Sequence, residues 1–481
     1  MAHIMQANRN HFLLNCGDRW IPEGSWLDKI LQKQFGSTIF SYRKIFSMLL
    51  PLIMDSFFVM AIGMLTTAMI SSSSQESVSA VSLIGPLNMM IYAIYNAISA
   101  GGTVIVAQFK GKGETERMKQ AAGQLLIATP LSAIVGAVIL ITFSGPIVEF
   151  LFHGVEPAVM RKAEQYMIGM TISSVFLAVY MGGFSVFRGL GETKICLRLT
   201  ILINLLHFLC SFLFINIWKL DIIGSVLALN IARFVGGAAA VWKLLSPRSV
   251  LRVEKRHVLR LDKAILAAIF SIGIPFGMEQ LFMNGGSMLV QIYVAKLGTS
   301  SVAANAIGNS VFALIQSAPA AVGTLAVTVI GQCYGSGDLE LSRRYGKSMV
   351  TLSFYLALFS ILLSLPFMPW ILKMYQAPQD TVRAIYSVLT IALVAMPLTW
   401  PVSYVMPNVL RATGDAKFSS YFSLVTMWAV RVGLGYVFAI TLKLGIRGVW
   451  YSMVLEWAVR SLVFWIRYRS GVWLRLPDSK K

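Results

Sequence analysis

The chain has 481 residues, of which 56% are hydrophobic and only 13% are charged, and its formal net charge is +20. This composition excludes an ordinary soluble domain, in which about 25% of residues are charged. In a soluble protein the positive charge would suggest a nucleic-acid partner, but here it follows the loops of a membrane protein, so no nucleic-acid partner is expected.

An N-terminal arm, residues 1–40, precedes the first apolar segment and is too polar for a cleaved signal peptide. Its segment SWLDKILQKQF (25–35) places Ser25 three residues before Asp28, as in a capping box, and gathers its apolar side chains on one helical face. We expect an amphipathic helix there, lying either on the inner membrane surface or as a cap over the loop that joins the two halves of the chain.

Twelve apolar segments follow, each long enough to cross about 30 Å of hydrocarbon as a helix. The sequence therefore predicts an all-α integral protein of the cell inner membrane or plasma membrane. Lys and Arg gather in the N-terminal arm, the even-numbered loops and the C-terminal tail, which places both termini in the cytoplasm. We predict an N-lobe of six spans at 41–246, a cytoplasmic linker at 247–263, a C-lobe of six spans at 264–469 and a cytoplasmic tail at 470–481.

The second half of the chain repeats the first at a separation of about 224 positions, as between Pro51 and Pro275. Two further pairs of segments carry the repeat: AQFKGKGE (107–114) with GQCYGSGD (331–338), and VFRGLGETK (186–194) with VLRATGDAK (409–417). Because each half has six spans, both halves enter the membrane in the same direction, and the pseudo-two-fold axis runs along the membrane normal.

Each half has a polar GxG turn (111–113 and 335–337) after its second span. We expect the glycines to adopt positive φ in a tight turn and the acids that follow, Glu114 and Asp338, to cap the next helix. A phosphate cradle would need a preceding strand or a Lys-Ser/Thr pair, and the sequence has neither.

One carboxylate stands in the first span of each half, a single turn after a proline: Asp55 after Pro51, and Glu279 after Pro275. The proline frees a backbone carbonyl on the preceding turn, and a charge within hydrocarbon costs about 2.5–3.5 kcal/mol. Asp55 and Glu279 are therefore candidates for binding a proton or Na⁺. A carboxylate that pairs with a basic residue at the helix entry would give the same pattern.

Further polar side chains within the spans fit two interpretations: they line a broad binding pocket, or they hold helices together. The pocket candidates are Thr66, Tyr92, Asn96, Asn284, Gln291, Asn309, Gln316 and Arg431.

The remaining embedded charges have several candidate partners. Glu456 and Arg460 stand at i, i+4, the spacing of a salt bridge on one helix face, and Arg431 could pair with either Glu279 or Glu456. Arg233 has no acid near it in sequence, and His207 is either a packed helix residue or a proton carrier. The four cysteines are scattered, so neither a disulfide framework nor a metal site is predicted.

Several of these motifs resemble signatures of the multidrug and toxic compound extrusion (MATE) family of secondary transporters. The resemblance covers residues 41–470 and rests on LPLI (50–53), the Gln-x-x-Gly-x-Gly-acid turns at 108–114 and 332–338, FRGLGETK (187–194), LRATGDAK (410–417) and RYRSGVW (467–473). It implies two six-helix lobes around a central cleft that opens alternately to either side, and export of small organic, often cationic and amphiphilic compounds in exchange for H⁺ or Na⁺. An enzyme is not expected, because no catalytic acids or histidines cluster near one face of the membrane, and we expect a monomer without a cofactor.

The acidic residues within the spans stand at different positions from those typical of the family. Many members carry an Asp late in the first helix where this chain has Thr66, and Asp55, three turns away on the same face, is a candidate replacement. Met283 stands near the position of the seventh-helix Glu of sodium-coupled members, and no acid lies between Asp380 and Asp415 to match members with a tenth-helix Asp.

An alternative function within the same fold is a flippase for lipid-linked saccharides. That function would require a more cationic cleft, with Arg233 and Arg431 facing it.

Overall fold

The computed structural model describes residues 25–37, 39–71, 74–247, 249–375 and 378–475. Within these ranges, twelve helices are long and apolar enough to cross a membrane, which confirms the predicted all-α architecture. The N-lobe helices are α3 (Tyr42–Ser71), α4 (Gln75–Lys112), α5 (Thr115–Thr142), α7 (Pro157–Gly189), α8 (Thr193–Ser211) and α9 (Asp221–Leu245). The C-lobe helices are α11 (Lys263–Ala295), α12 (Thr299–Gly335), α13 (Leu339–Ser364), α15 (Gln379–Ala412), α16 (Ala416–Thr426) and α17 (Gly445–Arg469).

Short helices lie at both ends of this framework. They are α2 (Trp26–Phe35), α6 (Ser144–Leu151), α10 (Lys255–Leu259) and α14 (Met368–Met374). The fifth span of each half ends in wider π-helical turns, η1 (Phe212–Ile217) after α8, and η3 (Met427–Leu434) and η4 (Val437–Thr441) after α16. The repeat seen in sequence therefore extends to a local departure from α-helical geometry.

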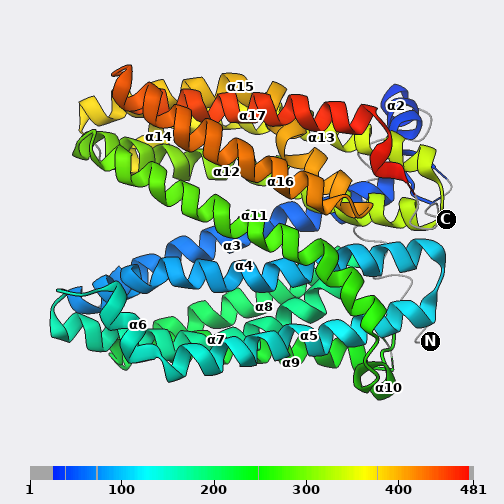
Figure 1. The fold of residues 1–481 in the computed structure, drawn as a ribbon, viewed down its shortest axis with the longest axis horizontal. Helices are drawn as coiled ribbons and strands as arrows, with labels where there is room; N and C mark the ends of the chain where they lie inside the picture. The colour runs from blue at the N-terminus through cyan, green and yellow to red at the C-terminus, as the bar shows by residue number, and fades with distance from the viewer. Residues whose placement is uncertain (1–24, 38, 72–73, 248, 376–377, 476–481) are drawn as a thin grey trace.

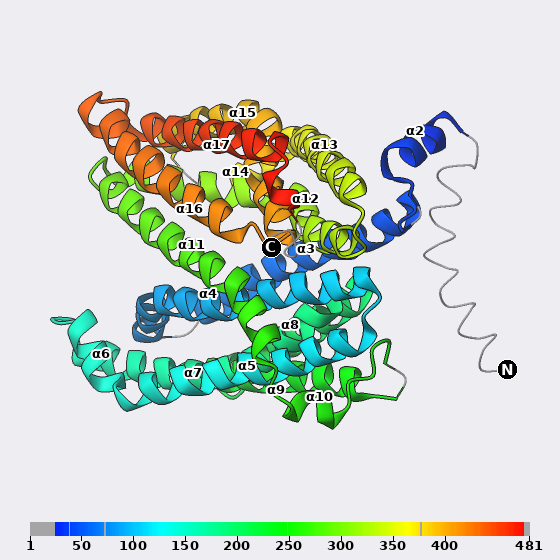
Figure 2. The same ribbon diagram turned by 45° about the vertical axis from the view of Figure 1, so that its right-hand side comes forward.

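The two lobes lie side by side, close together at the end that carries α2 and α10 and further apart at the other end (Figure 1). The first helix of each half runs between the lobes, so that α3 and α11 cross from one to the other, as the turned view in Figure 2 also shows.

Buried side chains explain why these two helices cross. Ile45, at the start of α3, is buried in one apolar cluster with Tyr345 of α13 and Val409 of α15, which belong to the C-lobe. In the same way Ile269, at the start of α11, is buried in a cluster with Leu125 of α5 in the N-lobe. Each lobe core thus includes the beginning of the other half's first helix.

The repeated polar turns meet each other where the lobes are closest. The Gln108 side chain on α4 donates a hydrogen bond to the carbonyl oxygen of Ala412 (2.8 Å), and the Gln332 side chain on α12 donates to that of Gly189 (2.9 Å). A Cβ on Gly111 would overlap the carbonyl oxygen of Gln332, and a Cβ on Gly335 would overlap that of Gln108. We call this contact of Gln108, Gly111, Gln332 and Gly335 the interlobe seam.

The turn chemistry predicted from sequence is correct for half of its residues. Gly113 (φ 74°) and Gly337 (φ 82°) do adopt left-handed conformations, and Asp338 caps α13 by accepting a hydrogen bond from the Leu341 N–H (2.8 Å). Glu114 makes no such cap and lies 3.4 Å from Arg117 instead. The first glycine of each turn stays helical, because its role is to let two backbones approach.

Two short helices cover equivalent places at this end of the lobes. Helix α2, capped by the Ser25 side chain, lies on the C-lobe, where the Tyr345 hydroxyl donates to the Phe35 carbonyl (2.6 Å). Linker helix α10 lies on the N-lobe, where His257 Nε2 is 3.0 Å from the Glu116 carboxylate. Whether α2 also lies on a membrane surface stays a prediction.

Candidate functional site

The carboxylate of Asp55 lies in a small polar site inside the N-lobe. Helix α3 carries it one turn after Pro51, and Arg188 at the end of α7 and Thr200 on α8 lie within interaction range. Its Oδ1 is buried and has no hydrogen-bond partner among the described residues. The Arg188 guanidinium stacks over the Phe184 ring at 4.8 Å. The site therefore holds an acid and a base that are close but not locked together.

The carboxylate of Glu279 occupies the equivalent place on α11 and is held tightly. It is 5% exposed, lies 2.8 Å from Arg411 at the end of α15, and accepts a hydrogen bond from Ser420 of α16 (2.9 Å). Arg411 also donates to Asn408 (2.8 Å), and its guanidinium stacks over the Phe276 ring at 4.1 Å. Both side chains of this ion pair are buried.

The two sites have the same arrangement of residues because they stand at equivalent positions of the repeat. Each half supplies an acid from its first helix and an arginine from the end of its fourth helix. Arg188 and Arg411 stand in the repeated FRGLGETK and LRATGDAK segments, but their role as partners of the acids was not predicted from the sequence. One feature of the sequence could have indicated this pairing: the arginine recurs in the second half of the chain at about the same separation as the two acids.

Both arginines line one cavity of about 230 Å³ between the lobes. Its polar and aromatic lining comes from α4, α7, α11, α12 and α15: Asn96, Thr103, Arg188, Phe276, Thr324, Tyr404, Asn408 and Arg411. Of the sequence-predicted pocket candidates whose side chains the structure describes, only Asn96 lies here. We call this space the interlobe cavity.

A second cavity, of about 240 Å³, lies inside the C-lobe and gathers three sequence candidates, Gln291, Asn309 and Arg431. Asn305 connects its walls, because it donates to Gln291 (3.1 Å) and accepts from the Trp450 indole N–H (3.1 Å).

Beside this cavity a buried carboxylate, Glu456, pairs with two arginines, Arg431 at 3.0 Å and Arg460 at 3.2 Å. The predicted Glu456–Arg460 pair is therefore confirmed, and Arg431 pairs with Glu456 rather than Glu279.

The remaining candidates are more dispersed. Tyr92 on α4 lies within electrostatic range of Asp55, Arg188 and Arg233, but it lines neither cavity. Asn284 is exposed on α11 and Gln316 is half-buried on α12, and they also line neither cavity. The Thr66 side chain lies outside the described residues.

Arg233 and His207 lie near each other in the N-lobe. Arg233 donates to the Ser173 hydroxyl (3.1 Å), and the phenols of Tyr92, Tyr95 and Tyr166 lie around its guanidinium. The hydrogen-bond partner found for this cation among the described residues is therefore a hydroxyl group, not an acid. In the described ranges no three His, Cys, Asp or Glu side chains are grouped as metal ligands.

The sequence and fold match known transporters. The family profile MatE matches residues 51–213 and again 275–437. The chain belongs to the MATE family. MATE proteins are transporters, not enzymes, and the twelve apolar helices make this chain a multi-pass protein of the plasma membrane. The two matched segments begin at Pro51 and Pro275, which preserves the register of the repeat.

Relatives and solved structures extend the match over most of the chain. An uncharacterized transporter, YisQ of Bacillus subtilis, is 25% identical over 90% of this chain and 95% of its own length. A probable multidrug resistance protein, NorM of Thermotoga maritima, is 22% identical over 90% of this chain and 93% of its own.

Among solved structures, an outward-facing multidrug resistance MATE family transporter of the MOP superfamily has a TM-score of 0.81 at 18% identity, covering 89% of this chain and 95% of that one. A mutant of the Vibrio cholerae MATE transporter VcmN has a TM-score of 0.80 at 21% identity, covering 89% and 96%. At these identities the solved structures establish the shared fold.

Proposed function

We propose that this MATE transporter exports small organic compounds in exchange for H⁺ or Na⁺, and that Asp55 and Glu279 bind the coupling ion. The observation that carries the proposal is the arrangement around the interlobe cavity. Each lobe contributes one arginine to its lining, and each arginine lies beside an embedded acid from the same half of the chain. A change of charge on either acid therefore acts directly on the wall of a space between the lobes.

The Glu279–Arg411 pair suggests how ion binding alters the lobes. A proton or Na⁺ on Glu279 cancels the charge that holds Arg411, so the attachment of α11 to α15 weakens. Because α11 begins in the N-lobe core and continues into the C-lobe, its attachment affects how the lobes sit on each other. An inward-moving charge supplies about 2.3 kcal/mol per 100 mV of membrane potential for this cycle.

The interlobe cavity is suited to part of a substrate rather than to all of it. Drug-sized sites span about 300–1,000 Å³, and this cavity is about 230 Å³. Its arginines and asparagines offer hydrogen-bond donors, and Phe276 and Tyr404 offer aromatic faces. This lining suits planar compounds that carry hydrogen-bond acceptors, and separation of the lobes would enlarge the space around them.

The positions of two other arginines favour this function over a lipid-linked saccharide flippase. That alternative needs Arg233 and Arg431 to face the central space. Arg431 lines the cavity inside the C-lobe and is paired with Glu456, and Arg233 lies among tyrosines in the N-lobe. Neither residue lines the interlobe cavity.

The test is efflux of organic cations and neutral dyes from proteoliposomes, with pH and Na⁺ gradients imposed separately. We expect one of the two gradients to drive efflux, and the Asp55→Asn plus Glu279→Gln double variant to abolish the gradient-driven part. The matched control is Glu149→Gln plus Asp380→Asn, which removes two exposed acids outside the candidate sites. Gradient-driven efflux that survives in the double variant would rule out these acids as the coupling sites.

A further inference from the structure

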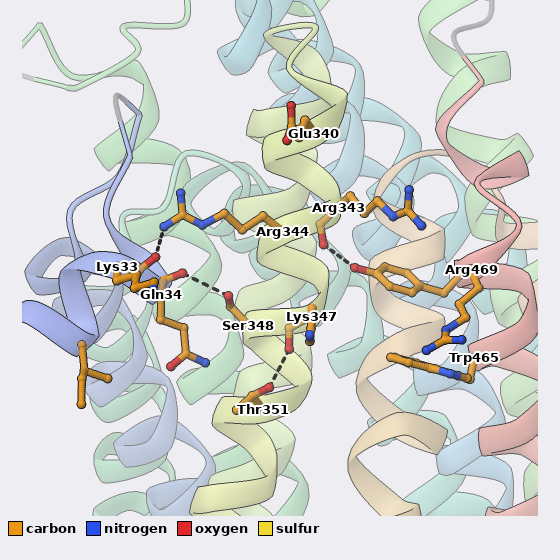
Figure 3. Close-up of a pocket in the computed structure, with 12 residues that line it drawn as sticks. Lys33, Gln34, Glu340, Arg343, Arg344, Lys347, Ser348, Thr351, Trp465 and Arg469 are labelled. Carbon is orange, nitrogen blue, oxygen red and sulfur yellow. Dashed lines mark hydrogen bonds between the residues drawn. The ribbon is translucent and has the colours of Figure 1, made fainter.

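A basic groove lies on the outer side of the C-lobe, away from the interlobe cavity. It has a volume of about 710 Å³ and is bounded by α2, α13 and α17 (Figure 3). Five basic side chains and a single acid, Glu340, line it. The basic residues are Lys33 on α2, Arg343, Arg344 and Lys347 on α13, and Arg469 on α17.

No described acid neutralises this charge by forming an ion pair. Within the part of the chain that the structure describes, none of the five basic side chains forms an ion pair. Arg344 donates to the backbone carbonyl of Lys33, and the Arg469 guanidinium lies over the Trp465 ring at 5.2 Å. These contacts orient the guanidinium groups and leave their charge unbalanced, so the groove fits an anionic ligand.

The basic groove continues into an apolar one. A second groove of about 460 Å³ shares Lys347, Thr351 and Trp465 with the first and is otherwise lined mainly by Val350, Val402 and Leu462. Beyond it, α13 carries exposed apolar side chains such as Phe359, as expected of a surface that faces lipid. A basic groove that opens into an apolar groove is complementary to a phospholipid, which has a charged head group and apolar acyl chains.

In the N-lobe the linker covers the equivalent surface, although the helices of this lobe follow the same repeat. The position equivalent to Lys347 is Gly123 on α5, and a Cβ there would overlap the carbonyl of His257 in the linker. The Gln124 side chain also donates to the Arg260 carbonyl (2.7 Å), so the linker covers this surface. In the C-lobe, α2 covers only one side and leaves the groove between α13 and α17 open (Figure 3).

We propose that this groove binds one anionic phospholipid from the leaflet at the end of the molecule that carries α2 and α10. The phosphate lies among Arg343, Lys347 and Arg469, and an acyl chain lies along Val350 and Val402. Basic pockets between membrane helices recognise anionic head groups in this way, and a Trp such as Trp465 is typical of the membrane interface. The lipid joins α13 to α17 at the surface of the C-lobe.

Native mass spectrometry of the purified full chain tests this proposal. The protein is equilibrated in mixed micelles of dioleoylphosphatidylglycerol and dioleoylphosphatidylcholine at equal concentration. We expect one retained phosphatidylglycerol per chain and at least about a tenfold preference over phosphatidylcholine. The triple variant Arg343→Gln, Lys347→Gln, Arg469→Gln should lose the preference. The matched control Lys112→Gln, Arg117→Gln, Arg256→Gln removes three exposed charges from the N-lobe side and should keep it.

A second variant tests the apolar half of the site without changing its charge. Val402→Trp fills the groove next to Trp465 and should lower phosphatidylglycerol retention at least about tenfold while all five basic residues remain. The proposal is overturned if wild-type protein retains both lipids equally or if the triple variant retains phosphatidylglycerol as wild type does. It is also overturned if inorganic phosphate at the same concentration displaces the lipid, since the groove would then be a phosphate site.

Discussion

At the scale of single residues, Asp55 and Glu279 hold equivalent positions in the repeat but differ in how they are held. Glu279 is paired with Arg411 at 2.8 Å and bonded to Ser420, whereas no ion pair within 4.0 Å is found for Asp55 among the described residues. Removing one partner of a buried ion pair leaves the other charge buried and unpaired, whereas a carboxylate with an unused oxygen can take a new ligand. The two acids therefore have different consequences when they are neutralised.

We predict that Glu279→Gln destabilises the purified protein by about 3–5 kcal/mol, because it leaves the Arg411 charge buried without a partner. Adding Arg411→Met should recover much of this loss, while Asp55→Asn alone should cost less than Glu279→Gln. Chemical unfolding in detergent gives the free energy of unfolding of the wild type, the two single variants and the Glu279→Gln, Arg411→Met double variant. Equal losses for Asp55→Asn and Glu279→Gln would contradict the difference in pairing.

At the scale of helices, the crossing of α4 and α12 depends on glycines that allow backbone contact. Gly111→Ala or Gly335→Ala would place a methyl group against a carbonyl oxygen, with an expected cost of about 1–3 kcal/mol. Gly85→Ala on α4 and Gly136→Ala on α5 are matched controls, since nothing lies within 4 Å of their Cβ positions. Unfolding midpoints should fall for Gly111→Ala and Gly335→Ala only, and the midpoints of the controls should stay unchanged or rise, because Ala has the higher helix propensity. A similar fall in the controls would contradict the role of backbone contact.

Three side chains of α13 hydrogen-bond to backbone carbonyls of α2, those of Arg344, Tyr345 and Ser348, and the Tyr345 phenol is the buried one that a conservative change can test. The Tyr345 hydroxyl donates to the Phe35 carbonyl and lies 2.9 Å from the Ser37 hydroxyl. Tyr345→Phe removes both contacts and should weaken the attachment by about 1–3 kcal/mol. Limited proteolysis should then cut within residues 25–40 faster than in wild type. The control, Tyr355→Phe, alters an exposed phenol on the same helix, and if it speeds cleavage as much, the Tyr345 contacts are not what holds α2.

At the scale of the whole molecule, the interlobe seam closes one end of the space between the lobes with two equivalent hydrogen bonds. The export cycle that we propose, with a cleft that opens alternately to either side, requires this seam to separate. Because the repeat relates the two bonds, Gln108→Ala and Gln332→Ala should have equal effects.

The measurement for the seam is the modification rate of Ala100→Cys, which lines the interlobe cavity, by a water-soluble thiol reagent applied at the end that carries α10. In a background without native cysteines, each Gln→Ala variant should raise this rate, and the double variant should raise it further. Gln124→Ala is the control, because it loses a similar bond to the Arg260 carbonyl but not one between the lobes. If the two single variants raise the modification rate by different amounts, the two hydrogen bonds do not contribute equally to closing the seam.

Much of the fold was predictable from the sequence. The length of the apolar segments predicted the twelve spans, and the repeat that relates Pro51 to Pro275 predicted the two halves. The i, i+4 spacing predicted the Glu456–Arg460 pair. The partners of Asp55 and Glu279 were not predictable, since Arg411 lies 132 residues from Glu279 and nothing local connects them. In a membrane the faces toward lipid and toward protein are both apolar, so periodicity does not reveal which helices meet.

The crossing of α3 and α11 also has a consequence for any half-length chain built on this plan. Alone, six helices would present the apolar start of their first helix with no core to enter, and would have an empty place in their own core where the partner's helix belongs. Two copies would satisfy each other by mutual insertion, as in a domain-swapped dimer. A forerunner of this protein, before the gene doubled, would therefore have been complete only as a pair.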